Sequence, residues 1–317
     1  MSGALRFDTA VPDGGYAWWY LDALSDDGQH GLTVIAFIGS VFSPYYAWAR
    51  RGSGVAPALN HCALNVALYA RPGSGAPTGW AMTERGRAQV HAGADRLQLA
   101  ASQVHWDGQQ LHIGICERTM PWGRPLRGQI TLTPHALHSH RYALDAGGRH
   151  RWTPLAPQAR VTVVLDAPSL SWEGHAYLDH NRGERPLADD FRRWDWSRAS
   201  LADGRSAVLY DASRSDGSDL SLALLFNGAA AATPFEAPPP QNLSASAWRL
   251  QRGTRAHAPG VAQVTQGMED GPFYARALLQ TELLGQAATA VHESLDMRRW
   301  LRPVVQAMLP FRMPRRG

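Results

Sequence analysis

The sequence predicts an all-β protein made of two antiparallel β-barrel or β-sandwich domains and a short amphipathic helix at the C-terminus. Three observations support this fold class. Gly and Pro together make up 51 of the 317 residues, or 16 %. An average protein has roughly 12 %, so this composition favours many turns. Apolar and β-branched segments recur between turn signals at intervals of about 8–12 residues. Helical periodicity is scarce before the C-terminus.

Length and composition limit the functions that the chain can have. A chain of 317 residues is long for one average domain and fits two. With 44 % hydrophobic and 18 % charged residues, it has the composition of a globular protein rather than a disordered one. All 31 basic residues are Arg, which excludes a Schiff-base lysine and a P-loop lysine.

The longest uncharged run, residues 31–49, is predicted to be a buried strand rather than a membrane-spanning helix. A spanning helix needs about 20 mostly apolar residues, whereas the strongly apolar part of this run ends at Phe42 and is followed by Ser43 and Pro44. Its apolar residues are mostly β-branched or aromatic, which favours a strand.

Further segments have the composition of strands closed by turns. We expect strands within residues 96–118, 128–134, 159–166, 206–214 and 219–228. Asp-Gly, Gly-Gly and Asn-Gly pairs supply the turn signals. These pairs stand at 107–108, 147–148, 203–204, 216–217 and 227–228.

A faint internal repeat indicates two related domains. The stretches that begin at Trp18 and Trp194 both place an aromatic cluster nine residues before an Asp-Gly turn, with an apolar strand after it. We place the junction near the proline-containing segment 152–159. This gives an N-terminal β domain over residues 1–157 and a C-terminal β domain over residues 158–317.

The C-terminal residues 298–317 are predicted to form a basic amphipathic segment. Its apolar residues recur at helical spacing, and six Arg residues flank them. The apolar residues are Trp300, Leu301, Val304, Val305, Met308 and Leu309. Such a segment suits an anionic membrane surface, and a helix docked on the protein's own barrel explains the same pattern.

Several other chemistries find little support. Cys62 and Cys116 are too few for a disulfide framework or a four-cysteine metal site, so we expect two reduced core thiols and a reducing compartment. Residues 1–15 show no charged region followed by an apolar stretch, so we expect no signal peptide. The histidine cluster at 135–140 lacks nearby carboxylates, so we expect no metal, and no nucleic-acid-binding motif is recognisable.

Two segments carry the polar and aromatic residues that point to chemistry. Because side chains alternate along a strand, His150 and Trp152 share one strand face, and His175, Tyr177 and Asp179 share another. One face then presents an imidazole and an indole, and the other a phenol and a carboxyl. A structural hydrogen-bond cluster at a barrel mouth is the alternative, because buried polar groups are normally paired.

Five blocks of the sequence resemble a known family. Residues 12–51, 59–69, 80–87, 174–187 and 274–300 are similar to blocks of the carotenoid 1,2-hydratases, also called hydroxyneurosporene synthases. The resemblance covers nearly the whole chain. The first and fourth blocks, which begin PDGGYAWW and GHAYLDHN, are long and specific.

The resemblance implies a lipocalin-like (calycin-type) fold for both domains and a defined reaction. The family adds water across the terminal C1–C2 double bond of acyclic carotenoids such as neurosporene and lycopene, in the carotenoid biosynthesis of photosynthetic bacteria. No cofactor and no metal are needed, so the implied partners are the carotenoid and water. Because this substrate is dissolved in the bilayer, we expect peripheral contact with the cytoplasmic side of the inner, photosynthetic membrane.

Hydration of an isolated alkene is acid chemistry, so the site needs an acid, a wall that tolerates a cation, and a held water. We expect Asp179 to be the acid, because a carboxyl in an apolar site stays protonated at neutral pH. Tyr177 and Trp152 are expected to form the wall. We expect His150 to hold the Asp179 proton or to accept the proton from water.

The expected set of substrate-binding residues is His175, Trp194 and Trp196. Two other functions stay open at this point: a carotenoid or lipid carrier without catalysis, and another cofactor-free terpenoid hydratase or pericyclase. A simple carrier does not need the Tyr-x-Asp and His-x-Trp pairs, which favours the enzyme.

Overall fold

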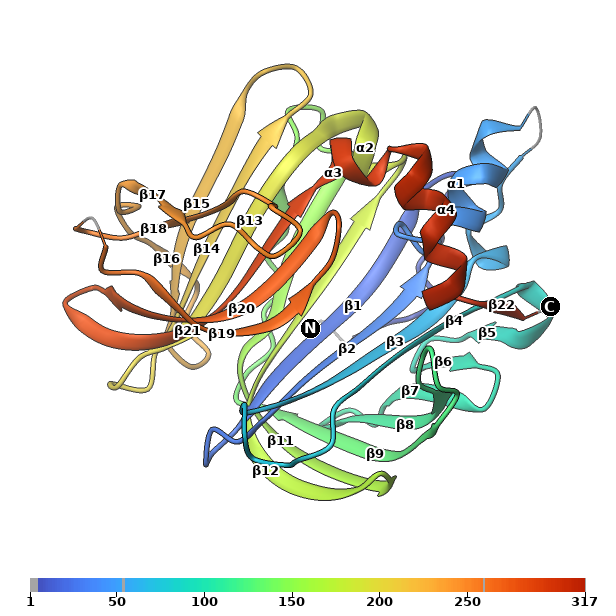
Figure 1. Ribbon diagram of the computed structural model, residues 1–317, viewed down its shortest axis with the longest axis horizontal. Helices are drawn as coiled ribbons and strands as arrows, with labels where there is room; N and C mark the ends of the chain where they lie inside the picture. The colour runs from blue at the N-terminus through green and yellow to red at the C-terminus, as the bar shows by residue number, and fades with distance from the viewer. Residues whose placement is uncertain (1–4, 53–54, 259, 317) are drawn as a thin grey trace. The chain divides into compact units, whose positions relative to one another are not determined.

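The computed structural model describes residues 5–52, 55–258 and 260–316. The first four residues, on which the expectation of no signal peptide partly depends, lie outside this description. The described chain is mostly β-structure, as predicted, and divides into two compact units (Figure 1). The first unit comprises residues 1–186 and 307–317, and the second comprises residues 187–306.

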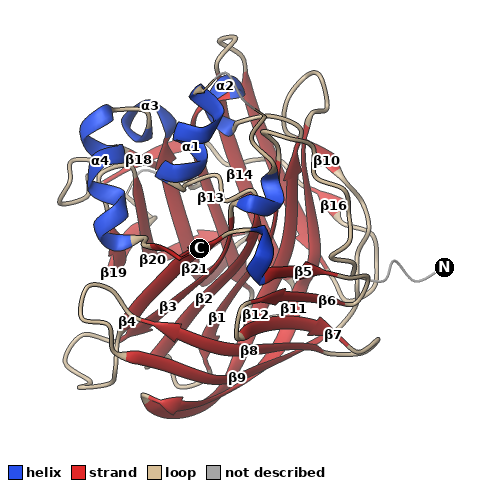
Figure 2. Ribbon diagram, turned by 90° about the vertical axis from the view of Figure 1, so that its right-hand side faces the viewer, coloured by secondary structure: helices blue, strands red, loops and turns tan. Residues whose placement is uncertain are grey.

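The first unit is one curled 13-stranded sheet in the order β22-β4-β3-β2-β1-β12-β11-β9-β8-β7-β6-β5, with β10 paired to β11. Its neighbouring strands are antiparallel, apart from the parallel pair β22 and β4. The strands β8 and β6 return against β4 and β3, so the sheet curls toward a barrel (Figure 2). The bounds are β1 (Tyr16–Ser25), β2 (His30–Ile38), β3 (Cys62–Ala70), β4 (Gly79–Arg85), β5 (Val90–Ala92), β6 (Arg96–Leu99), β7 (Ser102–Trp106), β8 (Leu111–Arg118), β9 (Pro125–Pro134), β10 (Tyr142–Ala143), β11 (His150–Ala167), β12 (Ser169–Gly183) and β22 (Arg315–Arg316).

The second unit is a seven-stranded sheet in the order β16-β15-β14-β13-β21-β20-β19, with a separate two-stranded ribbon, β17-β18. The bounds are β13 (Phe191–Ser200), β14 (Ser206–Arg214), β15 (Asp219–Phe226), β16 (Thr233–Pro234), β17 (Pro240–Leu243), β18 (Arg252–Arg255), β19 (Gln263–Asp270), β20 (Tyr274–Leu283) and β21 (Gln286–Asp296). The α-helices of the chain are short: α1 (Pro44–Arg51), α2 (Leu187–Asp190), α3 (Met297–Trp300) and α4 (Pro303–Arg312). Two 3₁₀ turns, Ala58–Asn60 and Arg87–Gln89, complete the helical structure.

The predicted strand in the longest uncharged run is confirmed as β2, and the run then turns into α1. Ser43 caps this helix, because its hydroxyl accepts the backbone N–H of Tyr46 at 3.1 Å. Pro44 occupies the first helical turn, where its missing N–H costs nothing. Over the described residues, no helix is long and apolar enough to cross a bilayer.

The internal repeat corresponds to two hairpins, β1-β2 and β13-β14. Each turns at the Asp-Gly pair that the repeat identified. Gly28 and Gly204 have φ angles of 66° and 84°, a region in which a side chain would be strained.

The domain boundary differs from the one predicted between residues 157 and 158, and lies between residues 186 and 187. The segment 152–159 is part of the long strand β11, which pairs with β12 on both sides of it. Its prolines produce β-bulges, seen as register shifts between Thr153 and Ala156 and between Ala156 and Ala159. Proline therefore marks an irregular strand here and not a linker.

The prediction of two core thiols is confirmed for Cys62 and wrong for Cys116. Cys62 is fully buried, and burial raises the pKa of its thiol to about 12. Cys116 is exposed, because β8 alternates and its even-numbered positions point away from the barrel core.

The apolar core of the first unit lies on one face of its sheet. Trp19 and Leu21 on β1 and Leu178 on β12 belong to that core. The opposite face is also buried along β1 and along residues 176–183 of β12, so burial alternates little in these two segments. That second buried face carries Trp152, Tyr177 and Asp179.

Candidate active site

Three neighbouring strands, β11, β12 and β1, bring the predicted catalytic residues together. The register places Trp152 on β11 directly opposite Asn181 on β12. Opposed residues of paired strands project to the same side of the sheet, and Asp179 is two residues from Asn181. His150 and Trp152 therefore lie on the same sheet face as Tyr177 and Asp179. This corrects the expectation of two separate faces.

Asp179 is the centre of a buried hydrogen-bond cluster, with only 4 % of the residue exposed. The indole Nε1–H of Trp152 and the hydroxyl of Tyr177 both donate to its Oδ2, each at 2.9 Å. Nδ2 of Asn181 donates to its Oδ1 at 3.1 Å. Of these three donors, two bond to Oδ2 and one bonds to Oδ1.

The electrostatics of Tyr177 fix its role as a donor. Burial raises the pKa of its hydroxyl well above the usual value, and the neighbouring Asp179 carboxyl raises it further. Asp22, opposite Tyr177 on β1, is also fully buried and acts in the same direction. The Tyr177 phenol therefore stays protonated at neutral pH.

His150 is fully buried and hydrogen-bonds to Tyr16, whose hydroxyl lies 2.9 Å from Nδ1. The backbone N–H of His150 donates to Oδ1 of Asp145 at 2.8 Å. Tyr16 stacks in turn on Trp18, with ring centroids 4.8 Å apart. Gly183 makes room for this pair, because a Cβ at that position would lie 2.2 Å from the Tyr16 ring and 2.6 Å from Nδ1 of His150.

Sequence reasoning missed Asn181 and the aromatic row on β1. Tyr16, Trp18 and Tyr20 line the same face, and Tyr20 lies opposite Asp179. The signal was present, because aromatic residues recur at period two in YAWWYLD, and Asn181 continues the Tyr-x-Asp pattern by one more step. The pairing of β1 with β12, which brings these residues together, could not be predicted from the sequence.

The structure does not bring His175 to this cluster, and its expected role in substrate binding stays a prediction. Its side chain is 62 % exposed, and its Nε2 lies 3.5 Å from Oδ1 of Asp26. Arg160 donates two hydrogen bonds of 2.7 Å to the same Asp26 carboxylate. In this half of β12 every second residue is exposed, so His175 shares the parity of Tyr177 but not its burial.

Trp194 and Trp196 belong to the second unit, on β13. Both are buried, and both lie on the face opposite to Ala199, which is part of that unit's apolar core. Trp194 contacts Phe191 edge to face, with ring centroids 6.3 Å apart. Their expected contact with substrate stays a prediction.

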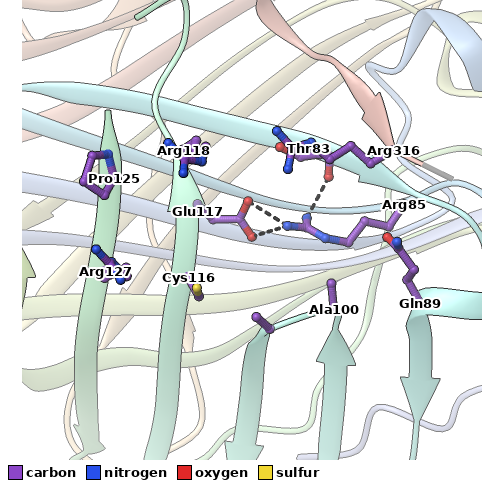
Figure 3. Close-up of a pocket in the computed structure, with 11 residues that line it drawn as sticks. Thr83, Arg85, Gln89, Ala100, Cys116, Glu117, Arg118, Pro125, Arg127 and Arg316 are labelled. Carbon is purple, nitrogen blue, oxygen red and sulfur yellow. Dashed lines mark hydrogen bonds and ion pairs between the residues drawn. The ribbon is translucent and has the colours of Figure 1, made fainter. Parts of the chain in front are cut away.

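A pocket of about 350 Å³ in the first unit shares no residue with the Asp179 cluster (Figure 3). Four Arg side chains and one Glu line it: Arg85, Arg118, Arg127, Arg316 and Glu117. Such a charged wall does not fit a long hydrocarbon, so this pocket is not the site for a polyene.

The histidine cluster at 135–140 lies between β9 and β10, outside any helix or strand. In the part of the chain that the structure describes, no group of three or more His, Cys, Asp or Glu side chains gathers at a position that could hold a metal ion.

Comparison with known proteins establishes the family. The family model described as "Carotenoid hydratase CrtC" matches residues 34–317. The chain belongs to this carotenoid hydratase family. The assignment confirms the resemblance on which the sequence analysis relied, and it covers both compact units.

The names of individual relatives are consistent with this family assignment. The acyclic carotenoid 1,2-hydratase of Thiocapsa roseopersicina is 51 % identical over 313 residues, which cover 98 % of this chain and 76 % of the relative. That of Rubrivivax gelatinosus is 48 % identical over 317 residues, which cover 99 % and 77 %. A solved AttH structure from Nitrosomonas europaea superposes with a TM-score of 0.59 at 17 % identity, over 92 % of this chain and 97 % of that one. This likeness supports the lipocalin-like all-β fold of this chain.

Proposed function

We propose that this chain is an acyclic carotenoid 1,2-hydratase, which adds water across the terminal C1–C2 double bond of a carotenoid such as lycopene or neurosporene. The family and the names of its relatives support the reaction class. The observation that carries the mechanism is the buried Asp179 carboxyl, held by three donors beside a row of aromatic side chains.

In the first step the alkene takes a proton from Asp179. The proton leaves the carboxyl, a C–H bond forms at C2, and the electron pair of the double bond is used in that bond. C1 is left as a tertiary cation, and Asp179 as a carboxylate. Trp152 and Tyr177, which already donate to Oδ2, stabilise the new charge without moving.

This arrangement assigns Trp152 and Tyr177 to positioning the acid, whereas the sequence suggested that they form the wall around the cation. Their polar edges are directed at the carboxyl. Tyr20 and Trp18 on β1 are the better candidates for the wall, because they line the same face and Tyr20 lies opposite Asp179. An aromatic face attracts a desolvated cation by about 2 kcal/mol.

In the second step water attacks C1, and the new oxygen loses a proton to His150. Asn181 is the proposed holder of this water. Among the described residues its Oδ1 is buried and has no hydrogen-bond partner, while its Nδ2 contacts Asp179. The Asn181 side chain thus holds the water through Oδ1 and contacts the acid through Nδ2. The water and the acid then lie close together, which the reaction requires because they add to adjacent carbons.

The substrate is insoluble in water, and this supports the proposal that the enzyme works as a peripheral protein on the cytoplasmic side of the bacterial inner membrane. The carotenoid must enter from the hydrocarbon region of that membrane. A surface that approaches the bilayer is therefore part of the proposed function.

The test is to incubate purified protein with lycopene in detergent, without added cofactor, in water enriched in ¹⁸O. We expect the pigment to gain the mass of one labelled water. An Asp179→Asn variant should lose this gain while still co-purifying with pigment. Pigment that stays bound but unchanged by the wild-type protein would contradict the hydratase and favour a carrier.

A further inference from the structure

We propose that the C-terminal helix α4 and the arginine-lined pocket beside strand β22 form a docking surface for anionic phospholipid. In this surface, apolar side chains of α4 enter the bilayer and the pocket holds a lipid phosphate. The inference rests on the membrane contact that the proposed function requires, and it names the surface and the lipid chemistry.

The helix α4 carries two apolar faces where an ordinary surface helix carries one. Val305 and Leu309 are buried against the protein, as expected of a docked amphipathic helix. On the other side, Val304, Met308 and Phe311 are 64 %, 42 % and 81 % exposed. Both interpretations of the sequence pattern therefore apply: one face is docked on the protein, and the other presents an apolar stripe to the surroundings. Such a stripe marks an interaction site.

The chain after α4 is held firmly on the first unit. The guanidinium of Arg312 lies 4.1 Å from the ring centroid of Trp80. The carbonyl of Pro314 accepts the backbone N–H of Glu84 at 2.9 Å, and β22 then pairs in parallel with β4. Arg315 forms an ion pair with the Glu84 carboxylate. These contacts fix the C-terminal end of α4 and the position of Arg316.

An aromatic anchor lies next to this segment. The hydroxyl of Tyr45 on α1 contacts the backbone of Arg315, and its ring meets Trp48 edge to face at 5.6 Å. Trp48 is 42 % exposed. Trp is enriched at the boundary between lipid headgroups and acyl chains, because its ring is apolar and its N–H is polar. Figures 1 and 2 show α1 close to residues 307–312 of α4, which belong to the same unit.

Most of the C-terminal arginines are occupied within the protein and are not available to lipid. Arg298 pairs with Asp296, and Arg299 donates to backbone carbonyls. Arg312 and Arg315 are engaged as described above. Charge complementarity with a membrane must therefore come from other side chains.

The pocket in Figure 3 supplies that charge. At its centre Arg85 donates to both oxygens of Glu117 at 2.8 Å, so this pair is neutral and buried. Arg118, Arg127 and Arg316 surround it. Within the described chain the side chains of Arg127 and Arg316 form no hydrogen bond, although the charge of Arg316 acts on the Glu117 carboxyl. Three guanidinium groups around a pocket of about 350 Å³ match a phosphate group, which accepts paired hydrogen bonds from arginine.

The experiment measures binding of the full chain to sedimented vesicles of phosphatidylcholine, alone or mixed with phosphatidylglycerol. We expect binding to the mixed vesicles. Met308→Gln/Phe311→Gln should weaken binding to both vesicle types. Arg127→Ala/Arg316→Ala should weaken binding to the anionic vesicles by roughly 10- to 30-fold and leave the neutral ones unchanged, because each cationic side chain near an anionic surface contributes about a factor of five.

Matched controls use residues outside this surface. Val164→Gln removes an exposed apolar side chain from β11, and Arg71→Ala/Arg96→Ala removes two exposed guanidinium groups. Both should bind like the wild type. Wild-type protein that ignores anionic vesicles, or variants that bind like the controls, would overturn the docking surface.

Two further measurements separate the alternatives. If calorimetry shows that inorganic phosphate binds the wild type but not Arg127→Ala/Arg316→Ala, and phosphate does not release protein from vesicles, the pocket serves a soluble anion and the lipid assignment is wrong. Hydration of lycopene in detergent micelles should be the same for all variants. If the wild type fails to hydrate lycopene in detergent, the proposed function fails, while the vesicle result is unaffected.

Discussion

The carboxyl of Asp179 experiences two opposing effects. Burial disfavours its charged form, and each donated hydrogen bond favours that form. Trp152, Tyr177 and Asn181 supply three such bonds. A carboxyl of this kind is suited to lose its proton in a transition state, because the donors that stabilise the anion are in place beforehand.

Removal of one donor should therefore slow the reaction without preventing binding. For Tyr177→Phe we expect kcat to fall by roughly 10- to 100-fold with KM nearly unchanged, because a hydrogen bond to a charged group contributes about 1.5–3 kcal/mol. Steady-state hydration of lycopene in detergent measures both constants.

Tyr142→Phe is the matched control for that variant. Its ring packs on Trp152 with centroids 5.4 Å apart, and it lies on the neighbouring strand β10. An equal loss of kcat in both variants would mean that the Tyr177 hydroxyl has no special relation to Asp179.

At the scale of elements, the β11-β12 hairpin and its neighbour β1 assemble the site. Residues near 16–20, 150–152 and 177–181 come from three parts of the chain, and the sheet register alone places them together. The strand β12 is central, because it carries Tyr177, Asp179 and Asn181 on one face between the other two strands.

Gly183 tests this packing. A methyl group at that position would meet the Tyr16 ring and the His150 imidazole at distances below van der Waals contact. For Gly183→Ala we expect a loss of roughly 1–3 kcal/mol in the free energy of unfolding, from overpacking, together with reduced hydration because His150 is displaced. Urea unfolding and the lycopene assay measure the two effects.

Gly267→Ala on β19 is the control, since a Cβ added there would have no atom within 4 Å and the φ of this residue is not in the left-handed region. It should be nearly neutral. Equal destabilisation by both substitutions would mean that Gly183 is not specially required.

Part of this element-level picture was predictable from sequence. Local signals decide strands and turns, so the Asp-Gly turns and the strands around them were predicted correctly, and so was the sharing of a strand face by Tyr177 and Asp179. Long-range pairing is not a local property. For that reason the sequence could not show that His150 and Trp152 share the sheet face of Asp179, or that β1 supplies Tyr20.

The burial of individual side chains was the second property that could not be predicted from the sequence. Strand parity groups His175 with Tyr177, but the exposed half of β12 separates them in environment. Alternation along β8 likewise shows that Cys116 shares a face with every second residue, but not whether that face points to the core or to the surface. The return of β22 to β4 depends on the Arg315–Glu84 contact, which joins residues more than 200 positions apart.

At the scale of the whole molecule, stability should depend on pH through a half-buried histidine whose Nε2 atom is buried. His180 packs on Trp19 with ring centroids 4.9 Å apart, and its Nε2 is buried with no hydrogen-bond partner in the described chain. Burial lowers its pKa to about 3. The unfolded chain, with a His pKa of about 6.5, binds a proton more readily.

The stability from His180 is therefore complete above about pH 6.5 and is lost as the pH falls toward the folded pKa of about 3. We expect a loss on the order of 1 kcal/mol per pH unit in this window. Between pH 7 and pH 5, His180→Phe should show a smaller drop in the free energy of unfolding by urea than the wild type. His91→Phe, at an exposed position of β5, is the control. An unchanged drop in His180→Phe would contradict the assignment.

The central claim is that Asp179 delivers the proton to C2, and a single-turnover reaction in D₂O tests it most directly. The wild-type product should carry one carbon-bound deuterium at C2, located by mass spectrometry of fragments. Asp179→Asn should bind lycopene equally well and form this product at least about 100-fold more slowly, the usual contribution of a general acid. Deuterium incorporation at the wild-type rate in Asp179→Asn would contradict the account and assign the acid to another residue.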